Sequence, residues 1–89
     1  MTFTVEYCRN WDGGRQELGA ASEAVHNIFP DAQIKAVVSD DYPITVSVLF
    51  GGKVLWTGSQ RNLFSKYYKA RTKSMREIQK ACIALKKEL

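Results

Sequence analysis

The sequence predicts an α+β protein with two layers, in which a four-stranded mixed sheet carries two helices on one face. Four segments alternate apolar and polar side chains, and two others repeat apolar side chains at helical spacing. Their order along the chain is β-α-β-β-β-α. Because each segment has one apolar face, both helices should cover the apolar face of the sheet. Residues 1–89 are expected to form a single domain with one core.

The first half of the chain is expected to form a β-α-β unit. Residues 3–7 place apolar side chains at every second position, as in a strand with one buried face. Helical spacing begins near Arg15 and is ended by Pro30, with Asp12 as the expected N-cap. A second strand is expected over residues 32–39. A right-handed crossover should place the two strands parallel to each other.

A β-hairpin is the clearest local signal in the second half. Apolar strands over residues 44–50 and 53–57 flank the pair Gly51-Gly52. Two adjacent glycines suit the positive φ angles of a tight hairpin turn. We expect Val54 and Trp56 to lie on the apolar face of the sheet.

The last helix is expected to begin near Ser74, because Ser74 and Glu77 have the spacing of a capping box. The preceding residues 58–73 are basic and aromatic without a firm period, and we expect them to form a long connection. The predicted apolar stripe of the helix consists of Met75, Ile78, Cys82, Leu85 and Leu89.

The composition argues against a membrane-spanning, a secreted and a zinc-binding protein. No apolar run approaches the roughly 20 residues that a membrane span needs. The first residues lack the regions of a secretion signal, so we expect a cytoplasmic protein without membrane contact. Cys8 and Cys82 are far apart and suggest no disulfide framework. Because His26 is the one histidine, we expect no zinc site and no resident cofactor.

The charge is unevenly distributed. Residues 1–56 hold four Lys or Arg and seven Asp or Glu, whereas residues 57–89 hold nine and two. A basic segment of this kind could serve an acidic partner or nucleic acid. A solvated face that keeps the protein soluble explains the charge equally simply. Charge alone favours the solvated face.

Cys8 is the candidate catalytic residue, because it lies where the first strand leads into the first helix. Unpaired backbone N–H groups and the helix dipole can activate a thiol in that position, and Arg9 would add to the effect. Strand alternation puts Cys8 on the mixed face beside Glu6, so we expect an exposed thiol. The alternative is a small buried side chain, as free cysteines often are.

The chain resembles the selenoprotein W family (the Rdx group). The likeness rests on Val5-Glu6-Tyr7-Cys8, Phe29-Pro30, the hairpin over 50–56 and the terminal helix. It implies a thioredoxin-like fold, glutathione-linked redox chemistry and protein partners. The family carries Cys-x-x-Cys or Cys-x-x-selenocysteine at this junction. Position 11 departs from that motif, since Trp11 stands where the second thiol or selenol would be.

The first hypothesis is therefore a redox protein with a single active-site thiol. Trp11 cannot resolve a mixed disulfide, so a disulfide on Cys8 would persist until an outside thiol such as glutathione removed it. Reversible oxidation would make the same thiol a redox sensor. The expected surroundings of the thiol are Arg9, Asn10, Trp11 and Pro43, the last resembling the loop proline, often cis, of thioredoxin-like folds.

The second hypothesis is a non-catalytic protein-binding module on the same scaffold. Residues 58–73 interleave cations with aromatic side chains, and Tyr, Trp and Arg are enriched in protein interfaces. Such a mixture can also bind nucleic acid, but no RNA-binding signature accompanies it, so we favour protein docking. The oligomeric state stays open. The candidate partner-binding residues are Trp11, Phe64, Tyr67, Tyr68, Lys69 and Arg71.

Overall fold

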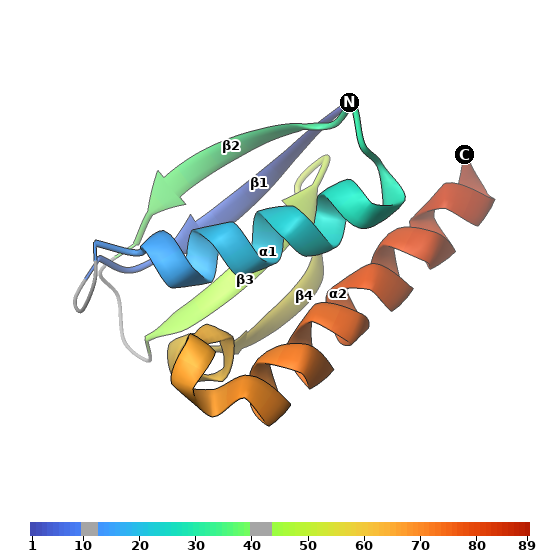
Figure 1. Cartoon of the computed structure of the whole chain (residues 1–89). Coiled ribbons are helices and arrows are strands. Elements are labelled where there is room, and N and C mark those ends of the chain that lie inside the picture. The colour runs from blue at the N-terminus through green and yellow to red at the C-terminus, as the bar shows by residue number, and fades with distance from the viewer. Residues whose placement is uncertain (10–12, 40–43) are drawn as a thin grey trace.

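The computed structural model describes residues 1–9, 13–39 and 44–89. The first strand and helix are followed by three more strands, two short 3-10 turns and a long helix (Figure 1). In the described residues, no helix combines the length and hydropathy needed to cross a membrane. The elements are β1 (Thr2–Tyr7), α1 (Arg15–Ile28), β2 (Gln33–Val38), β3 (Thr45–Phe50), β4 (Lys53–Ser59), η1 (Gln60–Leu63), η2 (Ser65–Tyr67) and α2 (Tyr68–Glu88).

The sheet has the strand order β2-β1-β3-β4. β1 pairs with β2 in parallel and with β3 antiparallel, and β3 and β4 form the predicted antiparallel hairpin. Both helices lie on the same side of the sheet (Figure 1). The predicted fold class is therefore confirmed: an α+β sandwich consistent with a thioredoxin-like β-α-β-β-β-α layout.

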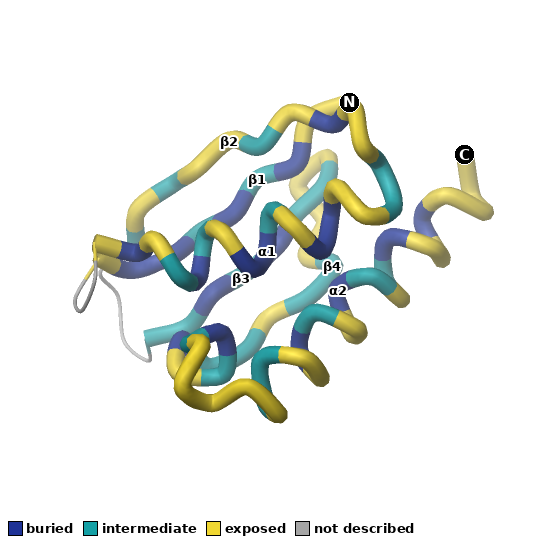
Figure 2. The backbone as a smooth tube through the Cα atoms, viewed as in Figure 1, coloured by how far each residue is buried: buried dark blue, intermediate teal, exposed yellow. Residues whose placement is uncertain are grey.

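The core lies between the sheet and the two helices. Four inward side chains of β1 and β3 are fully buried, as the alternation predicts, namely Phe3, Val5, Val46 and Val48. Buried positions also recur along α1 and α2 (Figure 2). At one end the ring of Phe3 packs between Phe29 and Phe50, with centroid distances of 5.4 and 5.0 Å. Phe3 thus joins β1 to the end of α1 and to the hairpin.

The hairpin turn is as predicted, but one strand face is not. Gly51 and Gly52 have φ angles of 58° and 80°, which favour glycine. Val48 pairs with Trp56, whereas Leu49 pairs with Val54, so the register shifts by one residue between them. A bulge of this kind reverses the alternation beyond it. The placement of Val54 on the apolar face is therefore wrong, and its side chain is 53% exposed.

Trp56 lies on the predicted face. Its ring is partly buried against the core, and its Nε1 donates a hydrogen bond of 3.0 Å to Oε1 of Glu77. This bond joins β4 to α2. Glu77 therefore serves as a tertiary contact of α2 and not as part of a capping box.

The predicted start of the last helix is wrong by six residues. α2 begins at Tyr68, and the expected long connection is instead the end of β4 followed by η1 and η2. Residues 67–69, 72 and 73 are all exposed, so the first turns of the helix bury too few apolar side chains to show a helical period. Ser74 is 4% exposed within the helix. Of the predicted stripe, Ile78, Cys82 and Leu85 are buried, Met75 is partly buried, and Leu89 is exposed.

The helix α1 begins close to the expected residue, with a different cap. Gly14 is the N-cap in the left-handed conformation, with φ 82°. The expected cap Asp12 lies outside the described residues. At the other end, the backbone N–H of Phe29 donates to the carbonyl oxygen of Val25 at 2.8 Å, just before Pro30.

Cys82 is core packing, as predicted, and burial raises the pKa of its thiol above the ordinary value of 9.0. The folded protein thus keeps this proton at a pH where the unfolded chain loses it, so the free energy of unfolding should fall as pH rises above 9. Urea unfolding between pH 7 and 10.5 should show a steeper fall for wild type than for Cys82→Ala. Parallel pH profiles would contradict this expectation, because Lys and Tyr titrate in both proteins.

Candidate functional site

Cys8 lies directly after β1, at the corner where the chain turns toward α1. The carbonyl oxygen of Tyr7 accepts a hydrogen bond of 2.7 Å from the backbone N–H of Ser39, which ties the ends of β1 and β2 together. Gly13 and Gly14 both have positive φ angles before the helix begins. The structure thus places Cys8 near the predicted strand–helix junction.

The Cys8 side chain is buried, with 1% of its surface exposed. The expectation of an exposed thiol is therefore wrong. The physical reason is that β1 ends at Tyr7, so strand alternation does not extend to Cys8, and Tyr7 and Cys8 are both buried. No disulfide joins Cys8 to Cys82.

The expected surroundings of the thiol are described only in part. Arg9 is exposed, so its guanidinium faces solvent. Asn10, Trp11 and Pro43 lie outside the described residues.

A buried polar network lies under the Cys8 corner. Nε2 of Gln60 donates to Oε2 of Glu17 at 2.9 Å and to the carbonyl oxygen of Cys8 at 3.4 Å. Glu17 is fully buried and Gln60 is 4% exposed. Glu17 lies in the first turn of α1, where the helix dipole favours a carboxylate. The network fixes the start of η1 against both α1 and the end of β1.

A second bond fastens the following turn to the same helix. Oε1 of Gln16 accepts hydrogen bonds from the backbone N–H and from the hydroxyl of Ser65, both at 2.8 Å. Leu63, which lies between Gln60 and Ser65 in the chain, is fully buried. The two 3-10 turns are therefore held against α1 at three points, although the sequence suggests a loose connection.

An exposed surface of aromatic and basic side chains stands on this anchored segment. The guanidinium of Arg61 and the ammonium of Lys66 each lie 5.1 Å from the centre of the Tyr67 ring. The rings of Phe64 and Tyr67 are stacked at 6.5 Å. We call these residues, with the adjoining start of α2, the aromatic–cation surface: Arg61, Phe64, Lys66, Tyr67, Tyr68 and Lys69.

The structure brings most of the predicted partner-binding residues together. Phe64, Tyr67, Tyr68 and Lys69 all belong to the aromatic–cation surface, and Tyr68 is 67% exposed. Arg71 lies apart, because its guanidinium faces α1 and is 3.8 Å from the Glu23 carboxylate.

The buried network and the aromatic–cation surface meet at Gln60. A surface pocket of about 360 Å³ is lined by Gln60 together with Arg61, Phe64 and Tyr67. The same glutamine bonds to Glu17 and Cys8 in the interior. Sequence reasoning missed Glu17 and Gln60. Their separation of 43 residues leaves no local signal.

The described residues contain no group of three His, Cys, Asp or Glu side chains that could hold a metal ion. The described part of the site is thus a buried thiol with a polar network beneath an exposed aromatic and basic surface. The chain was compared with protein-family models, curated proteins and solved structures, and none of these matches it.

Proposed function

We propose that this chain is a non-catalytic protein-binding module on a thioredoxin-like scaffold, and that it docks its partner through the aromatic–cation surface. The observation that carries the proposal is the exposure of Tyr68, with 67% of its surface open to solvent, beside the ordered ring of Tyr67. Large exposed aromatic side chains next to cations are a frequent feature of binding hot spots.

The order of this surface supports the proposal. Tyr67 is fixed by Phe64 and by two cations, and the segment below it is fastened to α1 by Gln60 and Gln16. A surface that is ordered before binding loses less conformational entropy when a partner docks. The hydrogen bonds to α1 therefore favour binding over a role as a loose connection.

The burial of Cys8 favours binding over redox chemistry. A thiol attacks as its thiolate and needs access to its target, whereas 1% of the Cys8 surface is exposed. A monothiol redox function, with glutathione as the mixed-disulfide partner, is the second candidate. It is supported by the place of Cys8 directly after β1 and by the resemblance to selenoprotein W.

Photo-crosslinking tests the proposal in cells. A benzoylphenylalanine at position 68 should capture a protein partner, whereas the same group at position 35 should not. Lys35 is the matched control because it is also exposed, and its pairing with Thr4 places it on the sheet face opposite the core. Mass spectrometry identifies the captured partner, which is then purified.

Calorimetry with that partner separates the two functions. Tyr68→Ala should weaken binding by about tenfold or more, the usual cost of truncating a hot-spot aromatic. Cys8→Ser should bind like wild type, provided that its circular dichroism is native. Equal crosslinking from positions 68 and 35 would contradict the docking surface. Loss of binding in folded Cys8→Ser would instead favour the redox function.

A further inference from the structure

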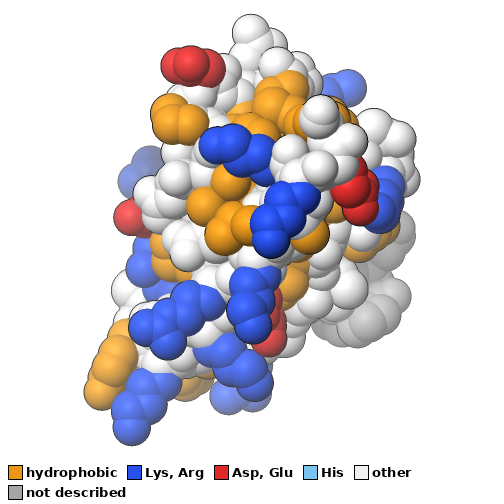
Figure 3. Space-filling model, turned by 90° about the vertical axis from the view of Figure 1, so that its right-hand side faces the viewer, with side chains coloured by type: hydrophobic (Ala, Val, Ile, Leu, Met, Phe, Trp, Pro, Cys, Tyr) orange, Lys and Arg blue, Asp and Glu red, His pale blue; other side chains and the backbone are white. Residues whose placement is uncertain are grey.

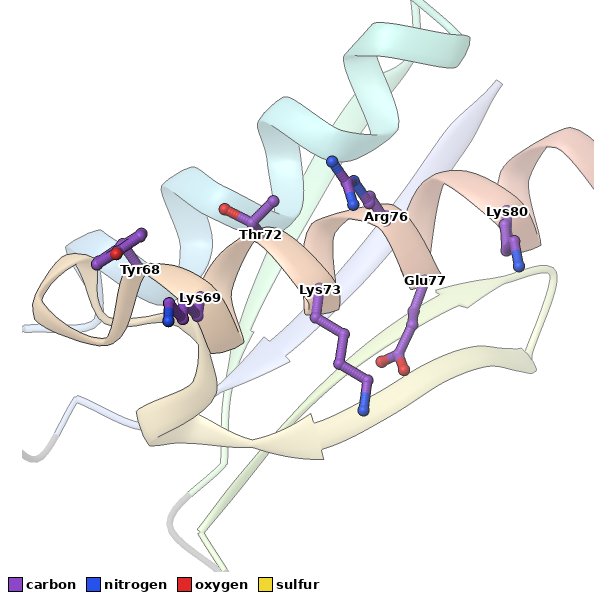
Figure 4. Close-up of a pocket in the computed structure, with 7 residues that line it drawn as sticks. All are labelled: Tyr68, Lys69, Thr72, Lys73, Arg76, Glu77 and Lys80. Carbon is purple, nitrogen blue, oxygen red and sulfur yellow. The ribbon is translucent and has the colours of Figure 1, made fainter.

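The exposed side of α2 carries a row of basic side chains that continues from the aromatic–cation surface. Lys69, Lys73, Arg76 and Lys80 are all exposed, and we call these four residues the basic ridge. They line a shallow hollow of about 510 Å³ together with Tyr68 and Thr72. Figure 4 shows Thr72 and Arg76 along one side of the helix and Lys73 and Glu77 along the other.

No carboxylate of the described residues lies within 4.0 Å of a cation of the basic ridge. Among the residues that the structure describes, the one ion pair within 4.0 Å joins Arg71 to Glu23, away from the ridge. The carboxylate nearest in sequence, Glu77, accepts the hydrogen bond from Trp56 Nε1. Figure 3 shows Lys and Arg side chains gathered over one part of this face, with few acidic ones among them. Four positive charges therefore stand close together, and one carboxylate, that of Glu77, lines the same hollow.

The spacing of the ridge is regular. Its members follow one another at intervals of four, three and four residues, which keeps them on one broad face of the helix, with Arg76 and Lys73 toward its two edges (Figure 4). From Lys69 to Lys80 the helix rises about 16 Å. An acidic helix with the same intervals, or about five residues of extended acidic chain, has carboxylates over that length.

Apolar side chains flank the ridge at both ends. Tyr68 is 67% exposed at the start, and Ile83, three residues beyond Lys80, is 42% exposed. A protein segment can cover all of these with acidic side chains in its middle and apolar ones at its ends. The phosphate backbone of a nucleic acid would supply negative charge opposite the four cations but no apolar contact for Tyr68 or Ile83.

We propose that the basic ridge binds an acidic segment of a protein partner, with carboxylates opposite the four cations and apolar side chains against Tyr68 and Ile83. This inference rests on the proposed binding function and names the chemistry of its partner. The affinity should decrease with added salt, because the charges are exposed and screened over about 10 Å at 0.1 M.

A designed peptide tests the inference directly. The probe is a fluorescent helical 12-residue peptide with Glu at positions 1, 5, 8 and 12, and a second peptide has the same composition with Glu spread around the helix. Fluorescence anisotropy at low salt should show tighter binding of the first peptide. The double variant Lys73→Glu/Arg76→Glu should weaken that binding by about tenfold or more, since two attractions become repulsions.

The matched control is Lys35→Glu/Lys53→Glu, which changes the net charge equally at two exposed positions outside the basic ridge. It should weaken binding less than about threefold. Equal losses in the two double variants would overturn the inference, because net charge alone would then explain them. The same double variant is also tested against a DNA duplex and a phosphatidylserine vesicle. If it loses binding to either of these but keeps binding to the peptide, the choice of partner is overturned. Failure of the peptide with continued crosslinking at position 68 would reject the acidic partner and keep the docking surface.

Discussion

Replacing Phe3 with alanine should lower the free energy of unfolding by about 3–5 kcal/mol, the usual cost of removing a large ring from a packed core. Phe3 is fully buried, and its ring contacts both Phe29 and Phe50. A domain of this size has about 5–15 kcal/mol of stability in total. The variant should therefore populate the unfolded state under mild conditions. Urea unfolding followed by circular dichroism measures the loss.

Val54→Ala is the control for this experiment. Val54 is also an apolar strand residue and was expected in the core, but the bulge in β4 leaves it 53% exposed. Its truncation should change stability by no more than about 0.5 kcal/mol. Similar losses in Phe3→Ala and Val54→Ala would contradict the assignment of Phe3 to the core and of Val54 to the surface.

The sheet could be predicted because its signals are local. Alternate apolar residues mark the buried face of β1, and the two glycines at 51–52 mark the hairpin turn. Each of these patterns depends on the backbone of a few neighbouring residues. The face assignment fails at Val54 because a bulge depends on how two strands pair, and the alternation of one strand does not record it.

The start of α2 could not be predicted for a different reason. The first turn of this helix places Tyr68 and Lys69 in solvent, so it lacks the apolar repeat that identifies a buried helix. The capping-box spacing at Ser74 then offered a plausible but incorrect start. Apolar periodicity therefore does not reveal helical turns that are exposed to solvent.

The sequence indicated the exposed residues of the candidate site but not the buried polar network beneath them. The aromatic and basic residues that form the surface are consecutive in the chain, so their gathering could be seen in the sequence. The bonds of Gln60 to Glu17 and Cys8 bring together three elements that are distant along the chain. Only the tertiary structure determines such a meeting.

This arrangement connects the two candidate functions. Gln60 contacts the backbone of Cys8 on its inner side and lines the pocket beside Arg61 on its outer side. Gln60 therefore links η1 to the Cys8 corner through its side-chain amide. A buried thiol and an exposed docking surface are thus parts of one anchored structure, even if the thiol performs no chemistry.

The same corner gives the second large effect, which we expect for Gly14→Ala. Gly14 has a φ angle of 82°, which costs alanine about 1–2 kcal/mol. A Cβ at this position would also collide with the Tyr7 ring, itself 8% exposed, and would lie 3.4 Å from the carbonyl oxygen of Cys8. Forcing a buried ring aside costs a further 1–3 kcal/mol or so. Urea unfolding should show both costs together.

Gly13→Ala separates the two costs. Gly13 has a similar φ angle of 73°, but among the described residues no atom that it could collide with lies within 4 Å of the site that a Cβ would occupy. Gly13→Ala should therefore lower the free energy of unfolding by the backbone cost alone, about 1–2 kcal/mol. Because displacement of Tyr7 also disturbs its neighbour Cys8, the thiol should alkylate faster in Gly14→Ala than in Gly13→Ala. Equal stability losses, or equal alkylation rates, would show that the Tyr7 ring does not hold this corner closed.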